Sequence, residues 1–159
     1  MKTIVAYDSY FGNTEKIAQA IGDALAETGE VEILRVGDVK PEQVAGLDLL
    51  VVGSATRQFS ASPGTMSMVK NLPAGALDSV QVAAFDTRIP EDEIQKNKIL
   101  KFFVGIFGYA AEPIARQLQK KGGKLAAPAA GFYVEGTEGP LSPGELERAA
   151  AWAKQLTAG

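Results

Sequence analysis

The stretch Leu47–Gly53, LDLLVVG, restricts the possible fold more than any other part of the sequence. Only Asp48 interrupts its apolar residues, whereas a strand with one face in water alternates between apolar and polar side chains. Uninterrupted apolar strands are typical of parallel sheets whose two faces are both covered by helices. The stretch therefore predicts a buried central strand in an α/β fold.

Apolar and helical patterns alternate along the rest of the chain as such a fold requires. Strands are expected at Lys2–Tyr7, Val31–Val36, Leu47–Gly53, Val80–Phe85 and Leu125–Val134. Helices are expected to begin near Asn13, Pro41, Ser62, Pro113 and Ser142. This alternation predicts a three-layer, doubly wound sheet of five parallel strands with helices on both faces.

Several residues suggest where the helices begin and end. Asn13 is the expected N-cap of the first helix, and Gly29 its expected stop. Pro113 is expected to open the helix before the fifth strand. The segment Ser142–Glu145 fits a capping box for the last helix, whose expected inner face includes Leu146.

Composition narrows the chemistry. The 159 residues are expected to form a single domain, residues 1–159, and contain neither cysteine nor histidine. Disulfides, thiol catalysis and histidine-based catalysis are therefore excluded, we expect no metal site, and redox chemistry would have to come from a bound organic cofactor. A net charge of −3 argues against nucleic acid as a partner.

A membrane span is not expected either. The longest uncharged apolar runs, Phe102–Ala111 and Leu125–Val134, have ten residues each, and a span needs roughly 20. The sequence begins with a strand pattern at Lys2 and shows no signal-peptide pattern. We therefore expect a cytoplasmic protein.

Three polar loops follow expected strands in an otherwise apolar chain, at residues 8–14, 54–60 and 86–90. In open α/β sheets, ligands bind beyond the carboxyl ends of the strands, where the strand order reverses. These loops are therefore expected to meet at one site.

The first loop has the features of a phosphate site. It leads from a strand into a helix, so that the backbone N–H groups of the first helical turn point outward and attract anions. It contains no lysine or arginine, and Ser9 and Thr14 are its best hydroxyl donors. A terminal monophosphate suits this compact loop better than a long polyphosphate.

Other classes of phosphate-binding protein fit the sequence less well. The sequence contains neither G-x-G-x-x-G after the first strand nor G-x-x-x-x-G-K-[ST] anywhere. A phosphoacceptor signalling domain needs a carboxylate at the end of the third strand, where this chain has Gly53 and Ser54. Asp8 alone does not make an acidic metal pocket.

The loop sequences resemble those of the flavodoxin family. Ser9–Thr14, SYFGNT, is similar to the flavodoxin phosphate loop, and Gly53–Thr56, GSAT, is similar to the second flavin loop. Asp86–Arg88 falls where the third flavin loop should begin. The resemblance implies a short-chain, flavodoxin-like sheet of order 2-1-3-4-5 that binds FMN non-covalently.

The resemblance also implies which residues contact the cofactor, and none of them is expected to act as an acid or a base. The expected FMN-binding residues are Ser9, Tyr10, Phe11, Gly12, Asn13, Thr14, Ser54, Ala55, Thr56, Arg57, Gln58, Phe59, Asp86, Thr87 and Arg88.

The chain departs from the family pattern around the flavin ring. Tyr10 and Phe11 occupy positions where flavodoxins often have threonine. The single tryptophan, Trp152, lies in the last expected helix, where packing is its expected role, and not in the second loop. Arg57 and Arg88 would place positive charge near the ring and would stabilise negative charge on reduced flavin.

Three functions follow from these features. The first is an FMN-dependent electron carrier, rather than a stand-alone enzyme, that exchanges electrons with a reductase and an acceptor protein and is monomeric by default. The second is an FMN-dependent NAD(P)H:quinone-type reductase, which would dimerise. The third is a flavin-free binding or regulatory domain on the same fold.

The charged segment Glu91–Lys101 has two interpretations. We expect a solvated face, and the alternative is a lid or docking segment over the flavin edge. Tyr109 lies shortly before the next expected helix and is expected in the core.

Overall fold

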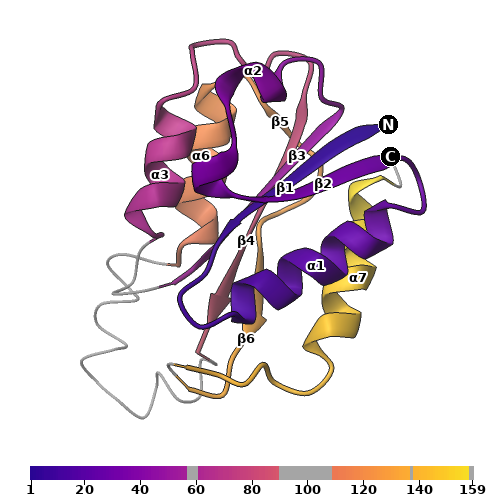
Figure 1. Cartoon of the computed structure of the whole chain (residues 1–159), viewed down its shortest axis with the longest axis vertical. Helices are drawn as coiled ribbons and strands as arrows, with labels where there is room; N and C mark the ends of the chain where they lie inside the picture. Colours follow the sequence, from indigo (N-terminus) through magenta and orange to yellow (C-terminus); the bar gives the residue numbers. More distant parts are fainter. Residues whose placement is uncertain (57–60, 90–108, 137, 158–159) are drawn as a thin grey trace.

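The computed structural model describes residues 1–56, 61–89, 109–136 and 138–157. A parallel sheet forms the middle layer, and helices cover both of its faces (Figure 1). The strands are β1 (Lys2–Asp8), β2 (Glu30–Arg35), β3 (Leu49–Ala55), β4 (Gln81–Arg88), β5 (Lys124–Leu125) and β6 (Ala130–Tyr133). The helices are α1 (Asn13–Leu25), the 3₁₀ helix η1 (Val36–Asp38), α2 (Pro41–Val44), α3 (Pro63–Lys70), α6 (Ala111–Lys120) and α7 (Glu145–Leu156).

The predicted strand order is confirmed. The strands follow the order β2-β1-β3-β4-β5, and β6 also pairs with β4. β3 lies in the middle, and Leu49 to Ser54 along it are all buried, as its uninterrupted apolar sequence predicted.

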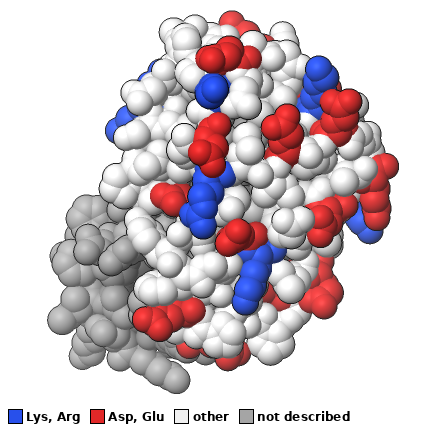
Figure 2. All heavy atoms as spheres, viewed as in Figure 1, with Lys and Arg blue, Asp and Glu red and all other residues white. Residues whose placement is uncertain are grey.

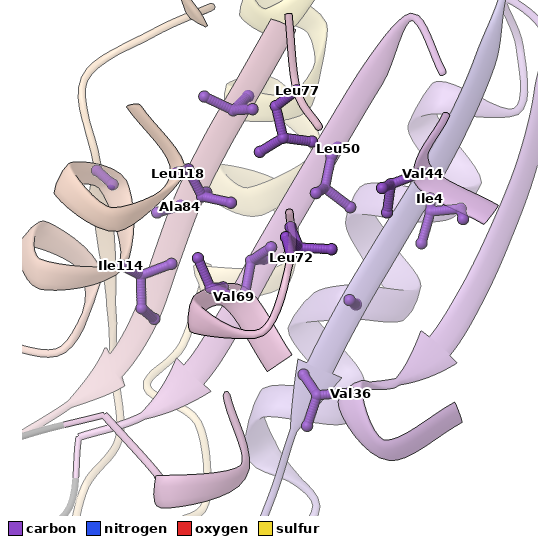
Figure 3. Close-up of a cluster of buried hydrophobic side chains, with 14 of the residues drawn as sticks. Ile4, Val36, Val44, Leu50, Val69, Leu72, Leu77, Ala84, Ile114 and Leu118 are labelled. Atoms are coloured by element: carbon purple, nitrogen blue, oxygen red, sulfur yellow. The ribbon is translucent and has the colours of Figure 1, made fainter. Parts of the chain in front are cut away.

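The core consists of two apolar clusters, one on each face of the sheet. α1 and α7 cover one face, where Ile17, Ile21 and Ala153 pack against the strands. α3 and α6 cover the other face, and Figure 3 shows Val69 of α3 and Ile114 of α6 beside the strands there. Successive strand residues contribute to opposite clusters, because side chains alternate across a strand.

The expected fifth strand is divided into β5 and β6. Both pair with β4, but residues 126–129 between them are not part of either strand. Pro128 lies in this interval, and proline has no N–H to donate to a strand ladder. The single strand Leu125–Val134 was therefore a wrong prediction.

β3 and β4 extend further than expected. β4 continues through Asp86, Thr87 and Arg88, because these residues pair with Gly131, Phe132 and Tyr133 of β6. Ser54 and Ala55 likewise belong to β3. Residues expected in two loops thus lie on the ends of two strands.

Two helix starts differ from the prediction because their expected caps make other contacts. α1 has Gly12 as its N-cap, and the Asn13 side chain donates to the carbonyl of Glu138 instead. α7 has Gly144 as its N-cap, and Glu145 accepts a hydrogen bond from the Tyr133 amide.

Three further details of the helices also differ from expectation. α6 begins two residues before Pro113, and α1 ends at Leu25, before Gly29. Leu146 is 43% exposed, so it is not part of the inner face of α7.

Two expected helix starts are confirmed. Ser62 caps α3, with its hydroxyl accepting from the Thr65 amide at 3.2 Å, and Pro63 follows as the first residue. Pro41 is the first residue of α2.

Candidate functional site

The carboxyl ends of three strands meet in register at one edge of the sheet. Asp8 of β1 pairs with Ser54 of β3, which pairs with Asp86 of β4. β1 ends at this row, whereas β3 continues to Ala55 and β4 continues to Arg88. Arg57, Gln58 and Phe59, residue 90 and the charged segment 91–101 lie outside the described residues.

The first loop is shaped by Gly12. Its φ of 88° lies in the left-handed region that favours glycine, and its amide donates to Ser9 Oγ at 2.9 Å. The turn delivers the chain directly into α1. Ser9 Oγ accepts this bond and keeps its own proton for a further acceptor.

The start of α1 presents amides without a cap. The helix has no side-chain cap, and its first internal hydrogen bond runs from the Lys16 amide to the Gly12 carbonyl. The amides of Asn13, Thr14 and Glu15 therefore have no intrahelical partner, and no acceptor for them is found in the described chain. Their partial positive charge makes this turn suitable for an anion.

The side chains of Asn13 and Thr14 point to neighbouring segments. Asn13 Nδ2 donates to the Glu138 carbonyl at 3.1 Å, and Thr14 Oγ1 lies 2.9 Å from Thr87 Oγ1. Both residues are buried. The loop after β6, which the sequence did not assign to the site, is thus fastened to the first turn of α1.

Tyr10 and Phe11 form an exposed aromatic pair on the first loop. They are 39% and 49% exposed, so each ring has a large surface toward solvent. Residues at these positions supply no short hydroxyl to an anion, which leaves the amides and the Ser9 and Thr14 hydroxyls as the donors of this loop.

The second segment is held from two sides. The Ser54 hydroxyl is fully buried and accepts a hydrogen bond from the Ser62 amide at 3.0 Å. The Thr56 amide donates to the Thr87 carbonyl at 2.9 Å, and Thr56 Oγ1 accepts from the Ala110 amide. Ala55 lies at the end of β3 and is partly exposed.

Asp8 and Ser62 connect the first segment to α3, and neither residue is among the expected FMN-binding residues. The Ser62 hydroxyl donates to Asp8 Oδ2 at 2.6 Å, and Asp8 Oδ1 accepts from the Ser9 amide. The serine was recognisable as a helix cap, but its contact with a carboxylate 54 residues earlier was not.

Asp86 and Arg88 form a bidentate ion pair on the α6 face of β4. Arg88 Nε and Nη2 donate to the two Asp86 oxygens at 2.6 and 2.7 Å. Asp86 Oδ2 also accepts from the Ala111 amide, at the start of α6. The Arg88 guanidinium lies over the Tyr109 ring, 3.7 Å from its centre. This ion pair is an alternative to flavin contact as the role of Arg88.

Burial of the ion pair affects the pKa values of both Asp86 and Arg88. Burial raises the pKa of Asp86, and the hydrogen bonds from Arg88 and Ala111 offset part of this. Burial acts to lower the pKa of Arg88, but the hydrogen bonds and charge of Asp86 outweigh it and raise that pKa. Because opposite charges lie in contact, Arg88 adds little net charge to the site.

Trp152 lies in the core, as predicted. Its ring makes edge-to-face contacts with Phe85 and Phe132, with ring centres 6.2 and 6.1 Å apart. Tyr109 is buried as well. Neither side chain is therefore free to cover a ligand at the sheet edge.

Glu145 of α7 accepts hydrogen bonds from the Tyr133 amide of β6 and from Arg148 in its own helix. Burial alone would raise the pKa of Glu145, but these hydrogen bonds and the Arg148 charge lower it. Its contribution to stability is therefore present above the unfolded-state pKa of about 4.3 and is lost as pH falls through the lower folded-state value. Glu145→Gln should lower the free energy of unfolding by about 1–2 kcal/mol at pH 7, and by less below about pH 4, in urea titrations.

Glu147→Gln is the matched control, because Glu147 lies in the same helical turn and is exposed. It should have little effect at either pH. An equal loss of stability in Glu145→Gln at both pH values would contradict the role of the charge.

Neither charge nor metal ligands mark a further site on the described part of the surface. On the face shown in Figure 2, acidic and basic side chains lie beside one another. Among the described residues, no group of three or more acidic, cysteine or histidine side chains could hold a metal ion. The described helices are also too short or too polar to cross a membrane.

Comparisons with solved structures identify the fold. Residues of this chain superpose on a flavodoxin from the domain Archaea with a TM-score of 0.72 and 21% identity, covering 98% of this chain and 96% of the other. The oxidised Flavodoxin 1 of Bacillus cereus gives a TM-score of 0.75 and 15% identity, covering 98% and 97%. The rubredoxin:oxygen oxidoreductase of Desulfovibrio gigas gives 0.72 and 17% identity, with 98% of this chain but 35% of that longer chain covered.

A search of curated proteins finds no match. The flavodoxin family model, in contrast, matches residues 5–152, which is nearly the whole chain and includes all the segments of the site. The protein therefore belongs to the flavodoxin family.

Proposed function

We propose that this protein binds FMN at the carboxyl edge of its sheet and passes electrons to and from redox partner proteins. Members of the flavodoxin family bind FMN and transfer electrons to such partners. The observation that carries the proposal for this chain is the uncapped start of α1 behind Gly12. A phosphate is the ligand that such a turn suits best.

The residues present fit the phosphate of FMN. The amides of Asn13, Thr14 and Glu15 would donate to it, together with the Ser9 and Thr14 hydroxyls. The loop contains no lysine or arginine, so the backbone and the helix dipole would have to balance the charge. A single terminal phosphate carries less negative charge for such a site to balance than a polyphosphate does.

The flavin supplies the redox chemistry when it is bound, and the protein supplies binding, orientation and access. Ser54, Ala55, Asp86, Thr87 and Arg88 lie on the strand ends that would border the flavin, and Thr56 directly follows β3. Arg88 is paired with Asp86, so it is expected to stabilise reduced flavin less than an isolated cation would. Because isolated cations near the ring would favour a reductase, the pairing of Arg88 favours the electron carrier.

Titration of the purified apoprotein with FMN tests the proposal. Flavin fluorescence should be quenched, and Ser9→Ala combined with Thr14→Ala should weaken binding about 10- to 100-fold, because two donors to the phosphate are lost. Thr28→Ala is a control, since Thr28 lies just beyond the far end of α1. Wild-type affinity in the double variant would overturn the phosphate assignment.

Anaerobic addition of NADPH to the FMN-loaded protein separates the two redox functions. A carrier should stay oxidised until a reductase is added, whereas a reductase should be bleached by NADPH alone. A protein that leaves FMN fluorescence unchanged would be a flavin-free domain.

A further inference from the structure

We propose that Thr87 is a positioning residue for phosphate binding: its hydroxyl donates to Thr14 Oγ1 and so leaves the Thr14 proton for the phosphate. The inference rests on the proposed FMN site and revises the role of Thr87 there. Thr87 would act through Thr14 and would not touch the ligand.

The two hydroxyls form a buried link between the first loop and β4. Thr14 Oγ1 and Thr87 Oγ1 are 2.9 Å apart, and the residues are 1% and 4% exposed. Thr14 lies in the first turn of α1, where the uncapped amides are. The link therefore reaches the expected anion position directly from the central sheet.

Strand alternation explains why Thr87 faces α1. Asp86 and Arg88 point to the α6 side of β4, where they meet each other and the Ala111 amide. Thr87 lies between them and therefore points to the opposite side, toward α1. The segment Asp86–Arg88 is thus divided between two tasks, with the ion pair on one face and the hydroxyl on the other.

The number of available protons determines which threonine hydroxyl donates to the other when phosphate is present. Each threonine hydroxyl has one proton, and either oxygen could donate in the observed pair. An ionised phosphate oxygen only accepts, so Thr14 can bond it only by donating its proton. Thr14 Oγ1 can then still accept from Thr87, which has no other hydroxyl partner in the described chain.

The position of Thr87 favours donation from its hydroxyl to Thr14 Oγ1. Its backbone pairs with Ala55 of β3 and Phe132 of β6, and its carbonyl accepts from the Thr56 amide. A β-branched side chain on such a strand has few rotamers. The hydroxyl therefore stays in place whether or not a ligand is bound.

A double-mutant cycle on FMN affinity tests the inference. Thr87→Val keeps the shape of the side chain and should weaken FMN binding about tenfold, while Thr87→Ser should retain most of it. In a Thr14→Val background, Thr87→Val should add little, because the two residues act as one unit. The affinity for riboflavin, which lacks the phosphate, should not change.

Thr3→Val is the matched control. Thr3 is also a buried strand threonine, but it lies near the other end of β1, and its hydroxyl has no partner among the described residues. It should leave FMN affinity unchanged. If Thr87→Val does not fold, Thr87→Ala removes the same hydroxyl and should give the same loss.

Three results would overturn the inference while leaving FMN binding intact. They are wild-type FMN affinity in Thr87→Val, an equal additional loss in the Thr14→Val background, and equal weakening of FMN and riboflavin. Failure of the wild-type protein to bind FMN would instead refute the proposed function.

Discussion

Asp86→Ala should lower the free energy of unfolding by about 3–5 kcal/mol, because it leaves the Arg88 guanidinium without its partner in a mostly buried position. Asp86 is fully buried, and the Arg88 side chain is 15% exposed. The substitution also removes the acceptor for the Ala111 amide at the start of α6. Urea denaturation followed by the fluorescence of the single tryptophan, Trp152, measures the loss.

Two further variants show whether the ion pair causes this loss. Asp48→Ala is the control, because Asp48 also accepts from a backbone amide, that of Lys2, but is exposed; it should cost about 1 kcal/mol or less. Asp86→Ala combined with Arg88→Ala removes both charges and should cost clearly less than the sum of the two single variants. Additive losses would mean that the two residues stabilise the protein independently.

The ion pair would also limit the effect of Arg88 on a flavin at the proposed site. A free cation at the end of β4 would favour the reduced, more negative flavin, but a bidentate partner at 2.6 Å balances most of that charge. The sequence allowed either role for Arg88, because both need an arginine at the end of the strand. Which role applies depends on the direction of the Arg88 side chain. That direction is set because β4 extends as far as Arg88.

Features set by local periodicity were predictable. The spacing of Ile17, Ile21 and Leu25 places them on one helix face, and all three are buried. The apolar run in β3 indicated its central position, because only a strand covered on both faces lacks polar alternation. Ser62 was recognisable as a cap because its partner, the Thr65 amide, lies three residues away.

Features that depend on distant partners were not predictable. Asparagine is a residue type typical of N-caps, but the side-chain amide of Asn13 donates a hydrogen bond to the carbonyl of Glu138, 125 residues later. The Thr14–Thr87 and Asp8–Ser62 contacts likewise join segments that only the folded sheet brings together. Sequence therefore indicated which segments form the candidate site, but not how its side chains divide between binding and support.

Gly53 should tolerate a side chain poorly, because it lies directly opposite Phe85 on the neighbouring strand. A Cβ at Gly53 would come within 2.0 Å of the Phe85 ring, so the ring would have to move. Phe85 in turn contacts Phe132 and Trp152, which leaves no easy rearrangement. Gly53→Ala should therefore lower the free energy of unfolding by about 1–3 kcal/mol, and Gly53→Val by more.

Thermal unfolding of paired variants tests this steric explanation. Gly37→Ala is the control, since a Cβ there meets nothing within 4 Å, and it should be nearly neutral. Phe85→Leu alone should destabilise the core, but in the Gly53→Ala background it should cost less, because the smaller side chain leaves room for the new methyl group. A loss in Gly53→Ala that Phe85→Leu does not relieve would point to backbone conformation as its cause, and not to contact with the ring.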